Sequence, residues 1–161
     1  MFENISIIGC GLIGSSILRA LNKKKISKKI TVYDKSKEVL SHLRQENLSI
    51  NISNDIRVSV KDADVVIIAT PLSSYKEILL SIKDHFKKGS ILTDTGSAKK
   101  EINKIIENLN LKDVSWIASH PIAGTENSGP KAGYAELFEN RWCIISPSPK
   151  AKKEEIEKIE I

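Results

Sequence analysis

A glycine pattern near the amino terminus constrains the fold of this chain more than any other feature. Gly9, Gly11 and Gly14 follow the apolar run 5–8 and open a stretch with helical period. Between a strand and a helix, this spacing gives a tight turn, lets backbone N–H groups approach a pyrophosphate, and allows close helix–strand packing. The pattern predicts a dinucleotide-binding unit whose helix N-terminus faces the phosphates; a glycine-rich turn without a ligand is the alternative.

A carboxylate ends the second apolar run and bears on the choice of dinucleotide. Asp34 lies about 20 residues after Gly14, where an acidic residue accepts hydrogen bonds from the ribose hydroxyls of NAD and repels the 2′-phosphate of NADP. Lys35 and Lys37 follow it and would soften that repulsion. The sequence therefore predicts NAD as the cofactor. The alternative for Asp34 is an acid that serves only a turn or a helix N-terminus.

Short apolar runs alternate with stretches of helical period along the chain. The runs lack polar alternation, as expected for strands covered on both faces. Strands are predicted at 5–8, 30–34, 65–69, 90–94, 116–119 and 142–146, and helices at 12–24, 36–46, about 73–87 and 98–109, with a short strand and a short helix within 49–60. This alternation predicts an α/β fold built on a Rossmann-type, doubly wound, mostly parallel sheet.

The last residues predict a short helix. Ser148 is a candidate N-cap and Pro149 a candidate first helical residue, and Ile156 and Ile159 would share one face. Because so short a helix is marginal in water by itself, it should either dock on the sheet or begin a longer helix. We accordingly divide the chain into an NAD-binding domain, residues 1–148, and the start of a connecting helix, residues 149–161.

Composition argues against several other classes of protein. The chain has 161 residues, 40% hydrophobic and 28% charged, as is typical of one soluble globular domain. Its net charge of +5 comes from scattered lysines and only 5% of residues are aromatic, so nucleic-acid binding is not expected. Cys10 and Cys143 lie far apart, and no export signal or membrane-spanning run is recognised. We expect a cytoplasmic protein without a membrane or metal partner.

Polar segments follow three of the predicted strands, at 69–74, at 94–100 and after Ser119. They should meet at the carboxyl edge of the sheet, where ligands of such folds bind. Ser97 is expected to cap the helix that begins with Ala98, and its hydroxyl could also hydrogen-bond a reacting group or a histidine.

Histidine is the side chain best suited to proton transfer near neutral pH. His42 and His85 fall in helical surface stretches and fit a structural role. His120 instead ends a predicted strand just before a glycine-containing loop, beside the expected cofactor. Pattern alone leaves it either a structural histidine or a general acid–base.

Three segments carry a resemblance to a known family: "GCGLIGSS" at 9–16, "DTGSAKK" at 94–100 and "SHPIAGTENSGPKAGYAELFENR" at 119–141. In this order and separation they resemble the nucleotide-binding domain of prephenate and arogenate dehydrogenases. The resemblance covers essentially the whole chain, and the His-Pro-x-x-Gly-x-Glu block is far more specific than the glycine pattern. It implies an oxidoreductase of tyrosine biosynthesis, an aromatic amino acid pathway, that uses NAD to convert prephenate to 4-hydroxyphenylpyruvate by oxidative decarboxylation.

The resemblance also implies roles for individual residues. His120 would be the base that hydrogen-bonds the ring hydroxyl of the substrate, and Ser97 would help to hold that hydroxyl and the imidazole. Thr125 and Glu126 would lie at the mouth of the substrate pocket. The residues that would hold NAD are Gly9, Gly11, Leu12, Ile13, Gly14 and Asp34, with Thr70 and Pro71 near the nicotinamide side.

Members of the resembled family continue into an all-helical domain, which supplies a cationic group for the substrate carboxylate and most of the dimer contact. That domain is expected to be absent here, so we expect this chain alone to be weak or inactive and a homodimer to form only in the complete enzyme. No arginine of this chain falls at an expected carboxylate site; the four are Arg19, Arg44, Arg57 and Arg141.

Three other functions stay open at this point. Two are dehydrogenases, the arogenate enzyme and another enzyme of the β-hydroxyacid type. The third is a non-catalytic, NAD-binding regulatory module, which would not need Ser97, His120 and Glu126 together. The sequence does not distinguish prephenate from arogenate, nor does it decide whether tyrosine inhibits the enzyme.

Overall fold

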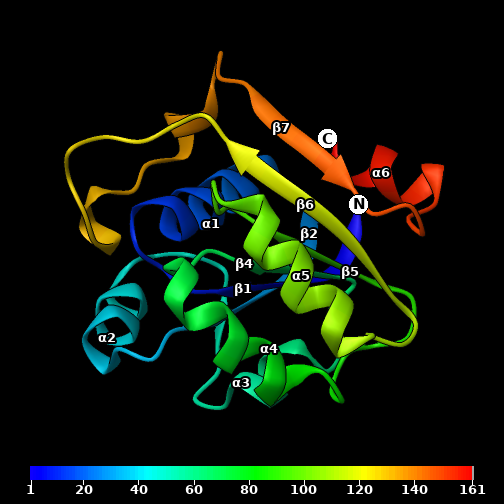
Figure 1. Ribbon diagram of the computed structural model, residues 1–161. Helices are drawn as coiled ribbons and strands as arrows, with labels where there is room; N and C mark the ends of the chain where they lie inside the picture. The colour runs from blue at the N-terminus through cyan, green and yellow to red at the C-terminus, as the bar shows by residue number, and fades with distance from the viewer. Residues whose placement is uncertain (161) are drawn as a thin grey trace.

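The computed structural model describes residues 1–160, and its centre is a seven-stranded sheet (Figure 1). The strands are β1 (Phe2–Ile8), β2 (Ser27–Tyr33), β3 (Asn51–Ile52), β4 (Val65–Ile68), β5 (Ser90–Asp94), β6 (Val114–Pro121) and β7 (Cys143–Pro147). Their order is β3-β2-β1-β4-β5-β6-β7. All neighbours are parallel except β7, which runs antiparallel to β6. This confirms the predicted α/β fold with a doubly wound, mostly parallel sheet.

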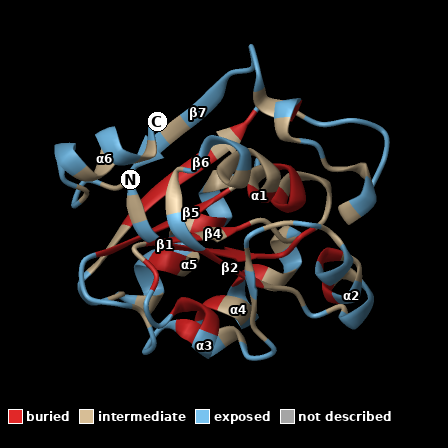
Figure 2. Ribbon diagram, turned by 180° about the vertical axis from the view of Figure 1, so that it is seen from behind, coloured by how far each residue is buried: buried red, intermediate tan, exposed pale blue. Residues whose placement is uncertain are grey.

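Helices cover both faces of the sheet. They are α1 (Leu12–Lys24), α2 (Lys37–Gln45), α3 (Ile56–Val60), α4 (Tyr75–Ile82), α5 (Lys99–Leu109) and α6 (Lys153–Ile159), with short 3₁₀ segments η1 (Leu72–Ser74), η2 (Pro130–Ala132) and η3 (Ala135–Phe138). Helices α3, α4 and α5 bury Val60, Leu79 and Ile102 on one face. Helices α1, α2 and α6 pack on the other, where Leu18 and Leu43 are fully buried. Buried residues follow the centre of the sheet, whereas β7 and α6 are largely exposed (Figure 2).

The register of the parallel strands brings their carboxyl ends together. Ile8 of β1 lies opposite both Tyr33 of β2 and Ile68 of β4. Ile68 in turn lies opposite Asp94 of β5. The residues that follow these strands therefore emerge side by side at one edge, as the sequence predicts for a ligand site.

Two helices differ from the prediction, one in its first residue and the other in its extent. Helix α5 begins at Lys99 with Ala98 as N-cap, and no side-chain hydrogen bond caps it within the described chain. The predicted capping role of Ser97 is therefore wrong: Ala98 has a non-helical ψ of 80°, so Ser97 lies one residue too far from the first turn. The helix predicted over about 73–87 divides into η1 and α4 and ends at Ile82, because a polar turn follows.

The predicted cap of the last helix is also wrong. Helix α6 begins at Lys153, and the N–H of Lys152 donates to Glu155 Oε2 at 2.8 Å. Ser148 instead continues the sheet edge, since its N–H donates to the carbonyl of Trp116 at 3.1 Å. Ile156 and Ile159 pack against the core on the α1 face, so the helix docks on the sheet. Ile161 lies outside the described residues, and the division at residue 148 stays a prediction.

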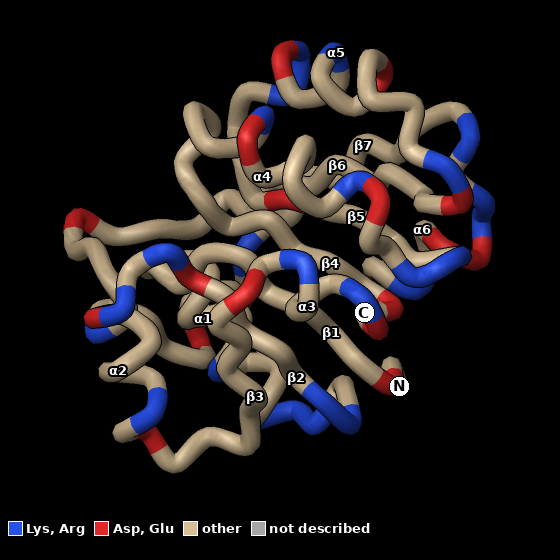
Figure 3. The backbone as a smooth tube through the Cα atoms, turned by 90° about the horizontal axis from the view of Figure 1, so that it is seen from below, with Lys and Arg blue, Asp and Glu red and all other residues tan. Residues whose placement is uncertain are grey.

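The charged residues are distributed around the molecule. Lys and Arg are interspersed with Asp and Glu over most of the tube, although several Lys lie close together near β2 (Figure 3). Within residues 1–160, no helix is long and apolar enough to cross a membrane.

Candidate active site

The glycine turn between β1 and α1 is shaped for close approach of a ligand. Gly9 has φ +90°, and a Cβ there would lie 2.5 Å from Thr70 Cγ2 and 2.8 Å from the Ala69 carbonyl oxygen. A Cβ on Gly14 would lie 2.0 Å from the Gly9 carbonyl oxygen, which shows how closely α1 packs on the turn. Gly11 faces open space. Gly9 thus bends the chain tightly, Gly14 lets α1 pack closely on the turn, and Gly11 keeps the outer side accessible.

The N-terminus of α1 fits a phosphate group. Gly11 is the N-cap and no side chain caps the helix among the described residues. The first turn also carries no acidic residue that would compete with an anion. Unpaired backbone N–H groups and the positive end of the helix dipole therefore face the open side of the turn. Leu12 and Ile13, two of the predicted cofactor residues, form the first turn of this helix.

Asp34 connects the glycine turn to the end of β2. Its Oδ2 accepts a hydrogen bond from the Cys10 N–H at 2.8 Å, and its Oδ1 accepts one from the Ser36 N–H at 2.8 Å. The carboxylate is thus oriented by the backbone beside the turn, and each oxygen keeps a lone pair for a hydroxyl donor. Burial, and then the charge of Asp34, raise the pKa of the Cys10 thiol, which stays neutral beneath the turn.

Thr70 and Pro71 follow β4 at the same edge. The methyl of Thr70 approaches Gly9, as its distance to a Cβ there shows. The Thr70 hydroxyl is buried and has no hydrogen-bond partner in the part of the chain that the structure describes. Since buried hydroxyls are normally paired, this orphaned group fits a site that is completed by a ligand. Pro71 is exposed.

A buried ion pair, not anticipated from the sequence, lies at the ends of β5 and β6. Lys99 Nζ lies 2.6 Å from both carboxylate oxygens of Asp94 and donates to the Ser119 carbonyl at 2.5 Å. Asp94 also accepts from the Tyr75 hydroxyl at 3.3 Å and from the Gly96 N–H at 3.0 Å. We call these five residues the Asp94 cluster.

Burial governs the charges of the Asp94 cluster. It lowers the pKa of the Lys99 ammonium, an effect that the Asp94 carboxylate opposes. Burial, and then the charge of Asp94, raise the pKa of the Tyr75 hydroxyl. Tyr75 is therefore a neutral donor. The "DTGSAK" segment already held the signal: an acid and a lysine five residues apart flank a glycine turn and can fold back on each other.

His120 lies next to this cluster, one residue before the end of β6. Its Nδ1 is 3.4 Å from the carbonyl oxygen of Thr95. Because a carbonyl only accepts, we assign the proton to Nδ1, which leaves Nε2 as an acceptor. The distance is long, as catalytic hydrogen bonds often are before a ligand binds. The structure thus brings the strand end at 94–95 and the predicted base together, and the half-buried imidazole holds a proton-accepting nitrogen.

The other predicted substrate residues are exposed. Ser97 lies two residues beyond Thr95 on the turn that leads to α5. Thr125 and Glu126 lie on the loop after β6, where the Thr125 hydroxyl accepts a hydrogen bond from the Asn127 N–H at 3.2 Å. This bond is internal to the loop.

The loop over residues 122–142 leaves β6, passes α1 and returns as β7 (Figure 1). The Tyr134 N–H donates to the Ser16 hydroxyl at 3.1 Å, and Lys23 Nζ pairs with Glu136 at 2.6 Å. A Cβ on Gly133 would lie 2.1 Å from Ser15 Oγ. The loop therefore packs closely on the helix that follows the glycine turn.

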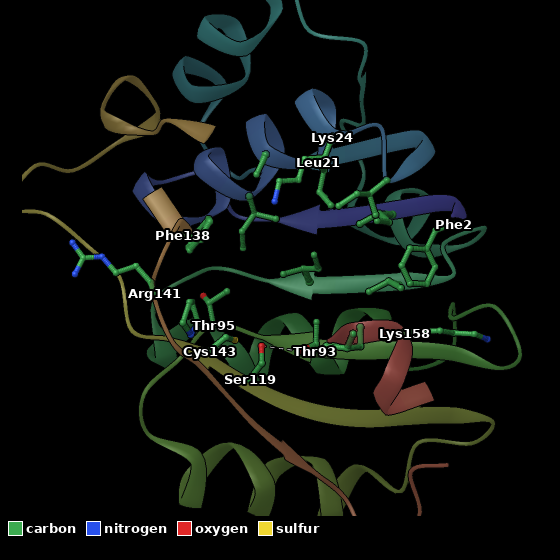
Figure 4. Close-up of a pocket in the computed structure, with 18 of the residues that line it drawn as sticks. Phe2, Leu21, Lys24, Thr93, Thr95, Ser119, Phe138, Arg141, Cys143 and Lys158 are labelled. Carbon is green, nitrogen blue, oxygen red and sulfur yellow. Dashed lines mark hydrogen bonds between the residues drawn. The ribbon is translucent and has the colours of Figure 1, made fainter. Parts of the chain in front are cut away.

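An apolar cavity of about 280 Å³ lies on the α1 face of the sheet (Figure 4). It extends from Phe2 and Lys158 to Ser119 and Arg141, and the Arg141 side chain points away from its centre. His120 alternates with Ser119 along β6 and therefore points to the opposite face. The cavity is thus separate from the His120 site.

A family model described as prephenate dehydrogenase, nucleotide-binding domain, matches residues 17–160. The chain belongs to this family. Cyclohexadienyl dehydrogenase of Zymomonas mobilis is 40% identical over 147 residues, which make up 91% of this chain and 50% of that protein. Prephenate dehydrogenase of Lactococcus lactis is 33% identical over 154 residues, 94% of this chain and 43% of that protein. The chain therefore spans about half the length of these relatives.

A solved member of the prephenate dehydrogenase family has the same fold. The A. aeolicus enzyme, crystallised with hydroxyphenyl propionate and NAD+, matches with a TM-score of 0.86 and 25% identity over 99% of this chain and 56% of that chain. Family membership confirms the resemblance carried by the three sequence segments. The family match starts at residue 17, so the nucleotide role of residues 9–14 rests on the turn geometry. The family match and the turn geometry together support a dinucleotide cofactor.

Proposed function

We propose that this chain is the nucleotide-binding domain of an NAD-dependent prephenate dehydrogenase, which oxidatively decarboxylates prephenate to 4-hydroxyphenylpyruvate. The observation that carries the proposal is the His120–Thr95 contact, which leaves Nε2 free to accept a proton at the carboxyl edge of the sheet. Family membership and the relatives' names support the reaction class. The non-catalytic NAD-binding module is disfavoured, because it needs no oriented imidazole.

The proposed site divides into a cofactor half and a proton-transfer half. The cofactor half comprises Gly9, Gly11, Leu12, Ile13, Gly14, Asp34, Thr70 and Pro71. The α1 N-terminus would bind the pyrophosphate, and Asp34 would accept the ribose hydroxyls, which favours NAD over NADP. When bound, NAD would accept hydride from the ring carbon that carries the hydroxyl.

His120 would transfer the proton in this reaction. As the ring carbonyl forms, Nε2 accepts the hydroxyl proton. Loss of carbon dioxide then leaves its electron pair in the ring, which becomes aromatic and carries a phenolate oxygen. His120 returns the proton to that oxygen, so charge and atoms balance. Ser97 would donate a hydrogen bond to the same oxygen, and Thr125 and Glu126 would line the pocket mouth.

Arogenate is a second candidate substrate. The ring hydroxyl that His120 would engage is common to arogenate and prephenate, and one relative is named for cyclohexadienyl compounds as a class. A dimer and a cytoplasmic location stay predictions.

The test is turnover by the protein encoded in the complete reading frame, followed by NADH absorbance with prephenate and with arogenate. His120→Asn should lower the turnover rate by about 10²–10⁴-fold and keep NAD affinity, because only the proton acceptor is lost. His85→Asn is the matched control, since His85 is exposed and away from the edge. A near-normal rate for His120→Asn would show that His120 is not the base.

A further inference from the structure

The Asp94 cluster has a geometry that the proposed proton transfer does not yet explain. The Asp94 side chain is fully buried, and that of Lys99 is 21% exposed. Removing two charges from water costs free energy that their attraction recovers only with excellent geometry and extra hydrogen bonds. A buried ion pair is therefore weak evidence of a purely stabilising role. Two of its partners here, Gly96 and Ser119, lie at the carboxyl ends of β5 and β6, and a third, Tyr75, lies on α4.

The ion pair fixes the backbone of the residue that precedes His120. The Ser119 N–H donates to Asp94 Oδ1 at 3.2 Å, and the Ser119 hydroxyl donates to the Asp94 carbonyl at 2.5 Å. The Ser119 carbonyl accepts from Lys99. The N–H, hydroxyl and carbonyl of Ser119 each have a partner in Asp94 or Lys99, although the hydroxyl also accepts from Thr93 Oγ1 at 3.1 Å, and the next residue is His120.

The Thr95 carbonyl, which accepts the hydrogen bond from the imidazole, is held in place by the same Asp94 carboxylate. Thr95 directly follows Asp94, and the turn after it is anchored by the Gly96 N–H bond to Asp94 Oδ2. The carboxylate therefore positions the residues on both sides of the His120–Thr95 contact. A small shift of either strand end would lengthen a contact that already measures 3.4 Å.

We propose that Asp94, acting through Lys99 and the backbone of Ser119 and Thr95, is a positioning residue that holds His120 with its proton on Nδ1 and with Nε2 as the acceptor. The inference rests on the proposed function for the role of His120 as base. Without the carboxylate, the Thr95 carbonyl and the imidazole lose their common anchor. The ring then turns, and the proton is no longer held on Nδ1.

The test measures the tautomer itself, by long-range ¹H–¹⁵N NMR of the histidines in the 161-residue chain near neutral pH. The parent should show the Nδ1–H form of His120, assigned by its loss in His120→Asn. In Asp94→Asn the population should move to the Nε2–H form. Lys104→Met, an exposed change on α5, is the control and should leave the tautomer unchanged. NAD affinity within about 2-fold of the parent shows that each variant is folded.

Asp94→Asn leaves the Lys99 charge buried beside a neutral amide, so it can fail to fold. The double variant Asp94→Asn/Lys99→Met removes both charges together and gives the same readout. In the protein from the complete reading frame, either variant should lower turnover by less than the roughly 10²–10⁴-fold expected for loss of the base, because the imidazole remains but is no longer held in its orientation.

A folded variant that keeps the Nδ1–H form overturns the inference, and so does a parent in the Nε2–H form. If the tautomer changes as expected and neither prephenate nor arogenate is turned over by the parent, the proposed function fails and the positioning role of Asp94 stands.

Discussion

At the scale of the residue, Asp34 is held by the backbone before any ligand binds. Its two bonds to N–H groups join the glycine turn to the turn after β2. A ligand hydroxyl therefore meets an acceptor that is already oriented, which reduces the ordering cost of binding. The neighbouring lysines are exposed, so their attraction for a 2′-phosphate is screened by water and salt.

The first residue-scale prediction concerns this carboxylate. NAD should bind more tightly than NADP by about 1–3 kcal/mol, the range for a hydrogen bond to a charged group gained or lost. Asp34→Ser should reduce that difference, because the repulsion of the 2′-phosphate disappears. Calorimetric titration of both dinucleotides measures it, with Asp84→Asn as an exposed control. Equal affinities in the parent would mean that Lys35 and Lys37 outweigh the carboxylate.

Another residue, Asp64, lies just before β4 and joins the start of β1 to the turn before β5. It accepts from the N–H groups of Glu3 at 2.8 Å and Asn4 at 3.1 Å, and pairs with Lys87 at 2.6 Å. Burial favours its neutral form, but the hydrogen bonds from Lys87 and from the Asn4 and Glu3 backbone outweigh this and lower its pKa from 3.8. A carboxyl with a depressed folded pKa stabilises the fold above its unfolded pKa.

Acid stability should therefore depend on Asp64. The stabilisation of the fold by ionised Asp64 is present at neutral pH and is lost as the pH falls from about 4 through the folded pKa. Asp64→Asn should lower the free energy of unfolding at pH 7, and its difference from the parent should shrink towards pH 3. Urea unfolding across this range measures it, with the exposed Asp62→Asn as control. A difference that is constant with pH would contradict the assignment.

At the scale of the element, the loop over 122–142 depends on close contact with α1. Gly133 faces Ser15, Arg19 and the backbone nitrogen of Ser16, the last at 3.0 Å from a Cβ. Arg19 is itself paired with Glu46, so it has little freedom to move. The loop can approach the helix only because this position has no side chain.

Gly133→Ala should consequently destabilise the protein by about 1–3 kcal/mol, the usual cost of overpacking. Gly124→Ala in the same loop is the matched control, because nothing lies within 4 Å of its Cβ. Urea unfolding of both variants compares them directly. If the two changes cost the same, the loop does not rest on α1 in solution.

Elements were predictable where local sequence decides them, and less so where tertiary contacts do. The strands and the glycine turn follow from apolar runs and spacing that need no partner. The predicted capping roles of Ser97 and Ser148 were wrong because tertiary contacts decide where those helices start. Lys99 folds back on Asp94, and the Ser148 N–H donates to the Trp116 carbonyl. The Asp94 cluster joins β5, β6 and α4, so it needed the strand register as well as the sequence.

At the scale of the whole molecule, the described chain contains the residues proposed to hold the cofactor, and the cation next to His120 is already paired. Lys99, which lies next to His120, is already engaged by Asp94 and the Ser119 carbonyl. Prephenate carries two carboxylates. A buried carboxylate that lacks its cationic partner costs about 2–5 kcal/mol of binding free energy. The curated relatives are about twice as long as this chain.

We therefore expect the 161-residue chain to bind NAD but to turn over prephenate several powers of ten more slowly than a full-length curated relative. Fluorescence titration measures NAD binding, and NADH absorbance measures turnover. Equal rates in the two proteins would show that residues 1–161 suffice for substrate binding.

The contact between the late loop and the early helix also sets an order of events during synthesis. Helix α1 ends at Lys24, and the residues that cover it, Tyr134 and Glu136, are made roughly a hundred residues later. At about 5–20 residues per second, that interval is on the order of 5–20 s. The nascent chain thus carries the glycine turn, the proposed phosphate site, with its helix uncovered on the outer side for seconds, before the strand that bears His120 is made.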